Sequence, residues 1–586
     1  MSKMLKESEL SYRVLLATYL KPQWKRALFM TLLLLFGIAL QLLNPQLLSY
    51  FITVATGNDK ELQPLLIVGA LFIGIALLGQ VISVSTTYLS ENVAWTATNK
   101  LRTDLVRHCL SLEMAFHKEH TAGELIERID GDVDTLSMFF SQAVVSLLGN
   151  GLLIIGIIVS LFYANWLIGL SIGLFALVGV VILSILRARV VTYSVADREK
   201  DAEFFGFLGE QLAGTEDMRA NGATGYVMRR FYQLLRGWLP VRRKMGLGWY
   251  SMWIVTLITF AFGNALALGL GAYLWHNGRI SLGTVYLAFY FTNLLNNPIE
   301  EIRNQLQQLQ LAGAGVVRIR QLLRTKPAIV DGTGQTLPEG ALDVEFRAVT
   351  FGYNAEQPVL SGINFHLEAG KVLGVLGRTG SGKTTLARLL LRLYDSQQGE
   401  ILLGAVPLRE ARLRDLRQHI GMVTQDVQLF HASVRDNLTF FNPAINDQDI
   451  LEVITDLGLT TWLQALPDGL DTMLGSDGEG LSAGEAQLLA FTRVFLSNPG
   501  LVIMDEASSR LDPATERLIE RAISKLLEGR TGIIIAHRLA TIQRADEIMI
   551  LENGQVLEQN QRLTLAANHD SRFYRLLKSS LEEVSA

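Results

Sequence analysis

The chain has 586 residues, of which 49% are hydrophobic, and it carries a formal net charge of −4 and one cysteine, Cys109. This length allows two or more domains, the charge argues against bulk binding of nucleic acid, and one cysteine excludes an internal disulfide framework and a cysteine-cluster metal site. Long apolar runs occupy residues 27–300, whereas residues 343–586 have the composition of an ordinary soluble α/β domain. We interpret Cys109 as a small buried or interfacial thiol.

The first 26 residues are polar and amphipathic, and no small-residue cleavage site follows the first apolar run. A secretory signal is therefore not expected. Residues 1–26 instead fit a cytoplasmic amphipathic helix that lies at the membrane surface.

Six stretches are long and apolar enough to span a membrane, because a spanning helix needs about 20 mostly apolar residues. They cover residues 27–52, 64–90, 139–163, 166–187, 249–275 and 281–298. The connections after the second and fourth stretches are long, polar and basic, whereas the other three are short. Under the positive-inside rule, the N-terminus, the long connections and the C-terminal domain are cytoplasmic, as in a multi-pass protein of the cell (inner) membrane. The alternative, buried core helices of a soluble protein, does not account for this charge asymmetry.

Amides are the main polar groups within the spans, and ionisable side chains are nearly absent there. The amides are Gln41, Gln46, Gln80, Asn150, Asn264 and Asn293. Intramembrane ionisable residues usually mark ion relays or charged-substrate sites, so their scarcity argues against a proton- or sodium-coupled pump and favours an apolar or amphipathic solute. Asn44-Pro45 is expected to kink the first span. The aromatic side chains of the last two spans fit either a cavity lining or ordinary lipid contact.

A glycine-rich segment joins a predicted strand to a predicted helix within "KVLGVLGRTGSGKTTLARLLL". We expect it to bind ATP through Gly377, Arg378, Thr379, Gly380, Ser381, Gly382, Lys383, Thr384 and Thr385. Glycines let backbone N–H groups wrap phosphate, Lys383 can reach the β and γ phosphates, and the Thr384 hydroxyl can bind Mg²⁺. The positive end of the helix adds to this site. The alternative is a structural glycine-rich turn, which the strand and helix context disfavours.

Two further predicted strands end in residues suited to ATP hydrolysis. "LVIMDE" ends in Asp505, which is expected to hold Mg²⁺ through water, and in Glu506, which is placed to polarise the attacking water. "GIIIAHR" ends in His537, which can contact the γ-phosphate. A solvated acidic loop and a structural histidine are the alternatives, but the order of the three motifs favours a catalytic role.

Together these motifs resemble those of an ABC exporter half-transporter, and the resemblance covers essentially the whole chain. It implies an α-helical transmembrane domain of six spans joined to an α/β P-loop ATPase domain. It also implies that Tyr353 in "VTFGYN" stacks on adenine, and that Gln425 in "MVTQD" touches Mg²⁺ and the attacking water. "GSDGEGLSAGE" and "SSRLD" (Ser508 to Asp512) match segments that contact the partner subunit. Tyr353 as an ordinary core aromatic is the alternative, and Arg378 stands at a variable position of the motif.

The resemblance assigns the two long cytoplasmic connections to coupling loops that rest on the ATPase domains, with short helices near residues 112–120 and 211–219. The implied boundaries are a segment at 1–26, a transmembrane domain at 27–320, a linker at 321–342 and an ATPase domain at 343–586. The implied cofactors are ATP and Mg²⁺. Two such chains close head to tail in this family, so each ATP lies between one chain's P-loop and the other chain's signature.

The signature of this chain, "LSAGEAQ", departs from the family pattern Leu-Ser-Gly-Gly-Gln. Ser482 and Gly484 are retained, but Ala483 adds a methyl group, and Glu485 puts a carboxylate near phosphate, which Coulomb repulsion disfavours. The residues expected to act on the chain's own ATP are all present. We therefore favour a heterodimer with a different half-transporter over a homodimer that tolerates both substitutions.

The predicted activity is ATP-driven export of a hydrophobic or amphipathic solute, by one subunit of a multidrug or lipid type of exporter. Two other functions use the same fold: import, as in siderophore uptake, and a nucleotide-gated channel or regulator. The small-molecule, lipid or peptide solute cannot be named from the sequence, and no nucleic acid is expected.

Overall fold

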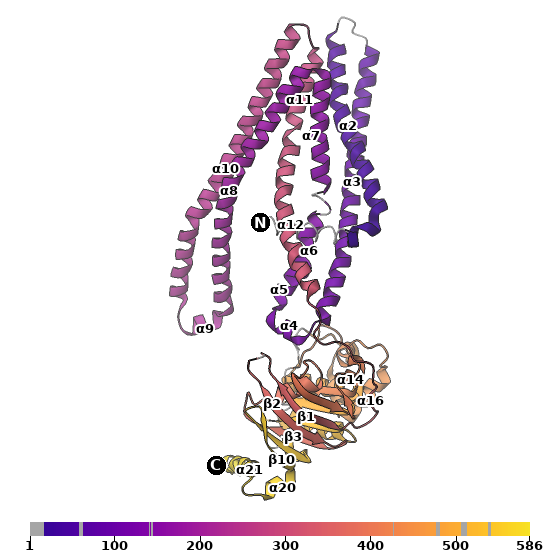
Figure 1. Cartoon of the computed structure of the whole chain (residues 1–586), viewed down its shortest axis with the longest axis vertical. Coiled ribbons are helices and arrows are strands. Elements are labelled where there is room, and N and C mark those ends of the chain that lie inside the picture. The colour runs from indigo at the N-terminus through magenta and orange to yellow at the C-terminus, as the bar shows by residue number, and fades with distance from the viewer. Residues whose placement is uncertain are drawn as a thin grey trace. The chain divides into compact units, whose positions relative to one another are not determined.

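The computed structural model describes residues 17–57, 62–139, 141, 144–354, 356–425, 427–475, 481–505, 513–536 and 541–585. It divides into two compact units (Figure 1). The first unit comprises Met1–Leu110 and Ala122–Thr325, and the second comprises Ser111–Thr121 and Lys326–Ala586. The short segment Ser111–Thr121 thus belongs with the C-terminal part of the chain, although it follows the second long helix.

The first unit is helical throughout its described length. Its main helices are α2 (Trp24–Thr56), α3 (Leu62–Ser111), α5 (Ala122–Ile126), α6 (Asp132–Met138), α7 (Val144–Ala164), α8 (Trp166–Ala213), α9 (Thr215–Ala220), α10 (Thr224–His276), α11 (Leu282–Leu294) and α12 (Asn296–Arg324). Helices α8 and α10 pack side by side over much of their length (Figure 1). The predicted hairpin between the third and fourth spans is very tight, because Asn165 alone separates α7 from α8 and caps α8 through its side chain.

Five helical stretches have the length and hydropathy of membrane spans: Ala17–Thr56, Leu62–Ser111, Val145–Ala164, Trp166–Ala213 and Thr224–His276. They correspond to the first five spans predicted from the sequence. Helix α2 continues through Pro45 without interruption. The sixth predicted span is divided: α11 ends at Leu294 and α12 begins at Asn296, so neither piece is a long apolar helix by itself.

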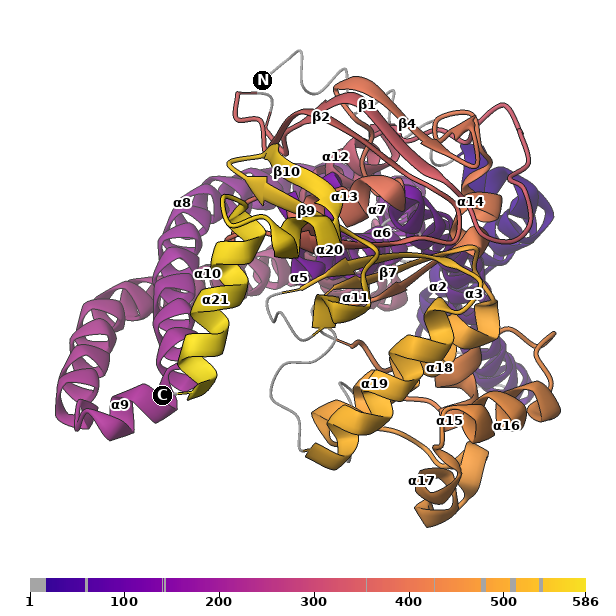
Figure 2. The same ribbon diagram turned by 90° about the horizontal axis from the view of Figure 1, so that it is seen from below.

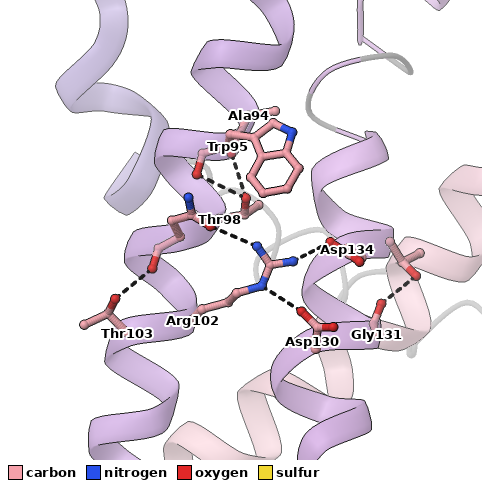
Figure 3. Close-up of polar contacts among 10 residues, drawn as sticks. Ala94, Trp95, Thr98, Arg102, Thr103, Asp130, Gly131 and Asp134 are labelled. Carbon is pink, nitrogen blue, oxygen red and sulfur yellow. Dashed lines mark hydrogen bonds and ion pairs between the residues drawn. The ribbon is translucent and has the colours of Figure 1, made fainter.

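Ion pairs hold α6 between two long helices of the first unit. Arg102 of α3 pairs with Asp130, at 3.1 Å, and with Asp134 of α6 (Figure 3). Arg318 of α12 pairs with Asp132 through both carboxylate oxygens, and Asp132 is buried. The Asp132 bond also raises the pKa of Arg318. Because an unpaired buried carboxylate is costly, these arginines fix the position of α6.

The second unit contains two sheets. Its strands are β1 (Val344–Phe351), β2 (Leu360–Leu367), β3 (Val372–Leu376), β4 (Gln398–Leu403), β5 (Val406–Pro407), β6 (Ile420–Val423), β7 (Leu501–Asp505), β8 (Thr531–Ile535), β9 (Glu547–Glu552) and β10 (Gln555–Gln561). One sheet has the order β2-β1-β4-β5 and is antiparallel. The other has the order β10-β9-β3-β8-β7-β6, and its five strands from β9 to β6 are parallel. Strands β3, β7 and β8 are buried at every position, as expected for a parallel sheet covered on both faces.

Helices pack around these sheets: α4 (Met114–Glu119), α13 (Lys383–Leu390), α14 (Leu413–His419), α15 (Val434–Thr439), α16 (Asp447–Asp456), α17 (Thr460–Ala465), α18 (Ala483–Ser497), α19 (Pro513–Leu527), α20 (Arg562–Ala567) and α21 (Arg572–Ser585). Helices α15 to α19 gather on one side of the parallel sheet (Figure 2). The predicted fold class, a helical transmembrane domain plus an α/β ATPase domain, is confirmed.

Candidate active site

Four parallel strands end at one edge of the larger sheet, and the predicted catalytic residues follow them. In the register of the sheet, Val375 of β3 lies beside Ile535 of β8, and Ile535 lies beside Asp505 of β7. Strand β6 extends the row, with Val423 beside Met504. Carboxyl ends of parallel strands meet at a common edge, which is where open α/β sheets bind ligands. The glycine-rich loop after β3, Asp505 and Gln425 therefore belong to one edge of the sheet.

The glycine-rich loop leads directly into α13, whose first residue is Lys383. Gly382 has φ +103°, and a Cβ there would lie 2.5 Å from Leu360 Cδ2, so only glycine fits. Lys383 Nζ donates hydrogen bonds to the carbonyl oxygens of Gly377, at 2.7 Å, and Arg378, at 3.1 Å. Ser381 Oγ is buried and has no hydrogen-bond partner among the described residues. The loop thus places a lysine and a hydroxyl at the positive end of a helix, which suits phosphate.

Tyr353 lies beside this loop rather than in an unrelated part of the core. Its hydroxyl is 3.1 Å from Thr385 Oγ1 and accepts a hydrogen bond of 2.9 Å from Arg388 of α13. Its ring meets Tyr394 nearly perpendicularly, with 5.2 Å between the centroids. Burial and the nearby Tyr353 hydroxyl raise the pKa of Tyr394. These contacts tie the ring of Tyr353 to the first turns of α13.

Lys118 is a residue of this site that the sequence motifs did not single out. It belongs to α4, and its Nζ lies 4.7 Å from the centroid of the Tyr353 ring, within the range of a cation–π interaction. The same segment is attached to the second unit by the Ala328 N–H, which donates to Glu113 Oε2 at 3.0 Å. The only indication in the sequence was that Lys118 lies in the first predicted coupling loop. No pattern in the sequence links a lysine of that loop to Tyr353.

The oxygen donors predicted for Mg²⁺ are compatible with that ion. Asp505 is 8% exposed, and Gln425 is exposed two residues beyond β6. With the Thr384 hydroxyl they form a set of hard oxygen ligands, the type that Mg²⁺ prefers. Among the described residues, no cluster of histidine, cysteine, aspartate and glutamate that could hold a different metal is found. The predicted catalytic residues Glu506 and His537, and the segment Ser508 to Asp512, lie outside the described residues.

The signature forms the start of α18, and its Glu485 closes back on Ser482. The Ser482 N–H and hydroxyl both donate to Glu485 Oε2, each at 2.7 Å, and the Glu485 N–H donates to Ser482 Oγ at 3.3 Å. This reciprocal arrangement is a capping box. Ala483 is exposed and Gly484 is buried. The donors of Ser482 that the motif would offer to phosphate therefore already bind a carboxylate of the same chain.

Arg493, farther along α18, links the signature helix to the segment that follows Gln425. Its guanidinium donates to the carbonyl oxygens of Asn437, at 2.6 Å, and Gln428, at 2.9 Å, and lies 4.6 Å from the Phe440 ring centroid. Burial lowers the pKa of Arg493 to about 10, so it is still a cation at neutral pH. No sequence motif selects this arginine, because its partners, the carbonyl oxygens of Asn437 and Gln428 and the Asn437 side chain, are distant in the chain.

Comparisons with known proteins agree with this architecture. The family description "ABC transporter transmembrane region" matches residues 27–299, and "ABC transporter" matches residues 360–509. An ATP-dependent lipid A-core flippase of Pseudomonas fluorescens is 31% identical over 534 residues, which cover 89% of this chain and 87% of the flippase. The chain belongs to the ABC transporter family. It is a half-transporter of the exporter type, in which ATP hydrolysis by the cytoplasmic ATPase domain drives export across the membrane.

Two other relatives and one solved structure are also similar to this half-transporter over most of its length. A lipid A-core flippase of Alcanivorax borkumensis is 28% identical over 570 residues, 96% of each chain. A probable multidrug resistance ABC transporter of Bacillus subtilis, YheH, is 28% identical over 530 residues, 88% of this chain and 77% of YheH. A bacterial Atm1-family ABC exporter, solved with ATP bound, has a TM-score of 0.76 at 23% identity and covers 95% of this chain and 98% of its own. That structure supports the fold alone.

Proposed function

We propose that this half-transporter is one chain of a heterodimer with two unlike ATP sites, and that it exports an amphipathic solute. The observation that carries the proposal is the difference between its two phosphate-facing elements. The sequence carries every residue expected to act on the chain's own ATP, whereas the signature is altered and the Ser482 N–H and hydroxyl bind Glu485. An altered signature suits a site that hydrolyses ATP slowly, and that site would be formed with the partner's P-loop.

In the proposed mechanism, Lys383 and the backbone N–H groups of the loop bind the β and γ phosphates. Thr384, Gln425 and Asp505 hold Mg²⁺, which neutralises charge on the phosphate oxygens when it is bound. Glu506 polarises the attacking water and His537 contacts the γ-phosphate. Tyr353 stacks on adenine. ATP stabilises the closed pair of ATPase domains because both chains contact it there, and hydrolysis removes that stabilisation.

The proposed solute class rests on the spanning helices and on the relatives. Many exposed side chains of α2, α3, α8 and α10 are aliphatic or aromatic, and no ion relay is expected from the sequence. Two relatives, a lipid A-core flippase and a probable multidrug resistance transporter, are consistent with this class, since a lipid is amphipathic. ATP-dependent accumulation of a fluorescent amphiphile with an uncharged head by inside-out vesicles would support this class.

The heterodimer is tested by native mass spectrometry of the assembly purified from its own membrane. We expect this chain with an unlike half-transporter of the same family. A complex of two identical chains with full ATPase activity would contradict the proposal.

The role of Glu506 is tested separately with Glu506→Gln in the same assembly. We expect most turnover to be lost, since the other ATP site is the slow one. Near-normal turnover would show that Glu506 is not the principal base, and it would leave the composition of the assembly as a separate question.

A further inference from the structure

The sixth membrane segment contains the polar sequence Asn293-Leu-Leu-Asn-Asn-Pro298, where α11 ends at Leu294 and α12 begins at Asn296. The backbone remains helical between them: Leu295 has φ −66° and ψ −21°, its N–H donates to the Phe291 carbonyl at 3.1 Å, and its carbonyl accepts from the Ile299 N–H at 3.3 Å. Pro298 has no N–H, so it cannot donate to the carbonyl oxygen of Leu294 four residues earlier. One helical hydrogen bond is therefore missing close to Asn293.

Three amides from neighbouring helices lie at similar distances from the outer ends of those helices. Asn264 lies thirteen residues before the end of α10 at Asn277, Asn293 lies twelve residues after Ser281, and Asn44 lies thirteen before Gly57. At 1.5 Å per helical residue, each is roughly 20 Å from its outer end. The hydrocarbon core is about 30 Å thick, so the amides lie well inside it. Helix α11 packs against both α2 and α10.

Asn264 and Asn293 bind each other and hold unused hydrogen-bonding capacity. Asn264 Nδ2 donates to Asn293 Oδ1 at 2.9 Å, and Asn293 Nδ2 donates to the Phe289 carbonyl at 3.0 Å. Among the described residues, the Oδ1 atoms of Asn44, Asn264 and Asn296 are buried and accept no hydrogen bond. An amide has two donor hydrogens and two acceptor lone pairs, so Asn293 retains one of each in these bonds. Unpaired amide groups away from water are unfavourable and call for a partner.

The exposed face of α11 differs from faces that suit lipid. Tyr286, Tyr290 and Asn293 follow one another at intervals of four and three residues, so they share a face. Tyr290 is 38% exposed and Asn293 is exposed, whereas Ala288 and Phe291 on the other side are fully buried. The outward side chains of α3 at a comparable distance from its outer end are aliphatic: Ile73, Leu77 and Leu78. A face of phenol and amide groups at this depth suits a solute pathway better than lipid tails.

We propose that the Asn264–Asn293 pair, with Tyr290 on the same face of α11 as Asn293, binds the uncharged hydrogen-bonding head of an amphipathic solute. The amides supply both donors and acceptors, and the tyrosine ring packs on the apolar faces of a head such as a sugar. None of these three side chains is charged, so the pair has no partner for a phosphate or an ammonium. The inference rests on the proposed export of an amphipathic solute and specifies which head group is recognised.

The test uses the complete assembly in lipid nanodiscs and three amphiphiles with the same dodecyl tail below their micellar concentrations. The amphiphiles are dodecyl maltoside, dodecyl phosphate and dodecyltrimethylammonium, and the readout is stimulation of the ATPase. We expect dodecyl maltoside to stimulate at the lowest concentration. Asn293→Leu should raise its half-stimulating concentration about tenfold, the effect of losing one or two hydrogen bonds.

Two further variants separate recognition from folding. Gln80→Leu is the matched control, because Gln80 is an exposed amide of a spanning helix outside the pair, and it should leave all three responses unchanged. Asn293→Asp adds a carboxylate and should shift the preference towards dodecyltrimethylammonium, a gain that a misfolded protein cannot show.

The outcomes distinguish this inference from the proposed function. Equal responses to dodecyl maltoside in the wild type and in Asn293→Leu would overturn the Asn264–Asn293 site, and so would a stronger response to dodecyl phosphate. If none of the three amphiphiles stimulates a turning-over ATPase, the amphipathic solute class itself is wrong. A loss of response in Gln80→Leu equal to that in Asn293→Leu would assign the amides to general packing of the spans.

Discussion

Helices α13 and α18 both begin at a sequence that is suited to phosphate, yet the polar groups at their first turns have different partners. At α13 the preceding loop is glycine-rich, Lys383 Nζ donates to the carbonyl oxygens of Gly377 and Arg378, and Ser381 Oγ has no hydrogen-bond partner among the described residues. At α18 a carboxylate of the helix itself takes the N–H and hydroxyl of Ser482. An anion from outside is attracted to the first helix and must compete with Glu485 at the second.

The two helix starts show that a helix N-terminus is not by itself a binding site for phosphate. A capping box satisfies the same backbone and hydroxyl groups that a phosphate would use, and its negative charge repels a second anion. In the proposed dimer, binding of the partner's ATP by this motif would therefore depend on Glu485, the third residue of the helix.

Lys383→Ala should reduce ATPase turnover about hundredfold or more, the scale expected when one preorganised donor to a reacting group is removed. Turnover of the purified assembly at saturating ATP measures this effect. Arg378→Ala is the matched control, because Arg378 is an exposed cation of the same loop, and it should have little effect. A modest loss of turnover in Lys383→Ala would show that Lys383 contributes little to the reaction and that the α13 end does not serve phosphate better than the α18 end.

Tyr353→Ala should weaken ATP binding about tenfold, because stacking of an aromatic ring on a base contributes roughly 1–3 kcal/mol. Tyr353→Phe keeps the ring and loses only the hydroxyl bonds to Thr385 and Arg388, so its affinity should stay within about twofold, since such bonds contribute modestly. Titration with a fluorescent ATP analogue compares the two. Equal losses in both variants would assign the role to the hydroxyl instead of the ring.

Glu485→Gln should raise ATPase turnover several-fold, because glutamine can maintain the capping box without the charge. Glu485→Ala removes the cap as well, which costs about 1 kcal/mol of helix stability. If charge is the barrier, turnover rises in both variants and the melting temperature falls only in the second. No rise in either variant would show that Glu485 does not restrict the site.

Ser482→Ala should change turnover least, by about twofold or less, since the Ser482 hydroxyl already donates to Glu485 and a single neutral hydrogen bond contributes little. The same substitution in a Glu485→Gln background should have a larger effect, because the hydroxyl is then available to phosphate. A double-mutant cycle on turnover measures this coupling. Additive effects would mean that the two side chains act independently.

The larger features of the fold followed from the sequence because they depend on local patterns. The length of the apolar stretches located the spans, and the strand–loop–helix pattern located Lys383 at the start of α13. The change from α11 to α12 at Leu295 was not predicted, although Asn296, Asn297 and Pro298 were visible. Hydropathy averaged over a span does not show the loss of a single helical hydrogen bond at one proline.

Contacts between distant segments could not be read from the chain. The Ser482–Glu485 capping box is different, because Ser-x-x-Glu before an apolar run is a local pattern visible in the sequence, but Glu485 was interpreted only as an unfavourable charge. Lys118 and Tyr353 are 235 positions apart, and Arg493 is held by carbonyl oxygens that carry no sequence signal. Such pairings arise from tertiary packing, for which a single sequence has no periodic signature.

The attachment of Ser111–Thr121 to the second unit has a consequence for dissecting this protein. Phe116 is buried there and stacks on His120 at 4.2 Å, while Lys118 faces Tyr353. A soluble fragment beginning at Lys326 would retain every nucleotide-binding motif and still lack this piece. Its ATP affinity and turnover would describe a protein whose Tyr353 has lost one neighbour. Kinetic constants measured on the isolated ATPase domain therefore do not transfer to the intact chain.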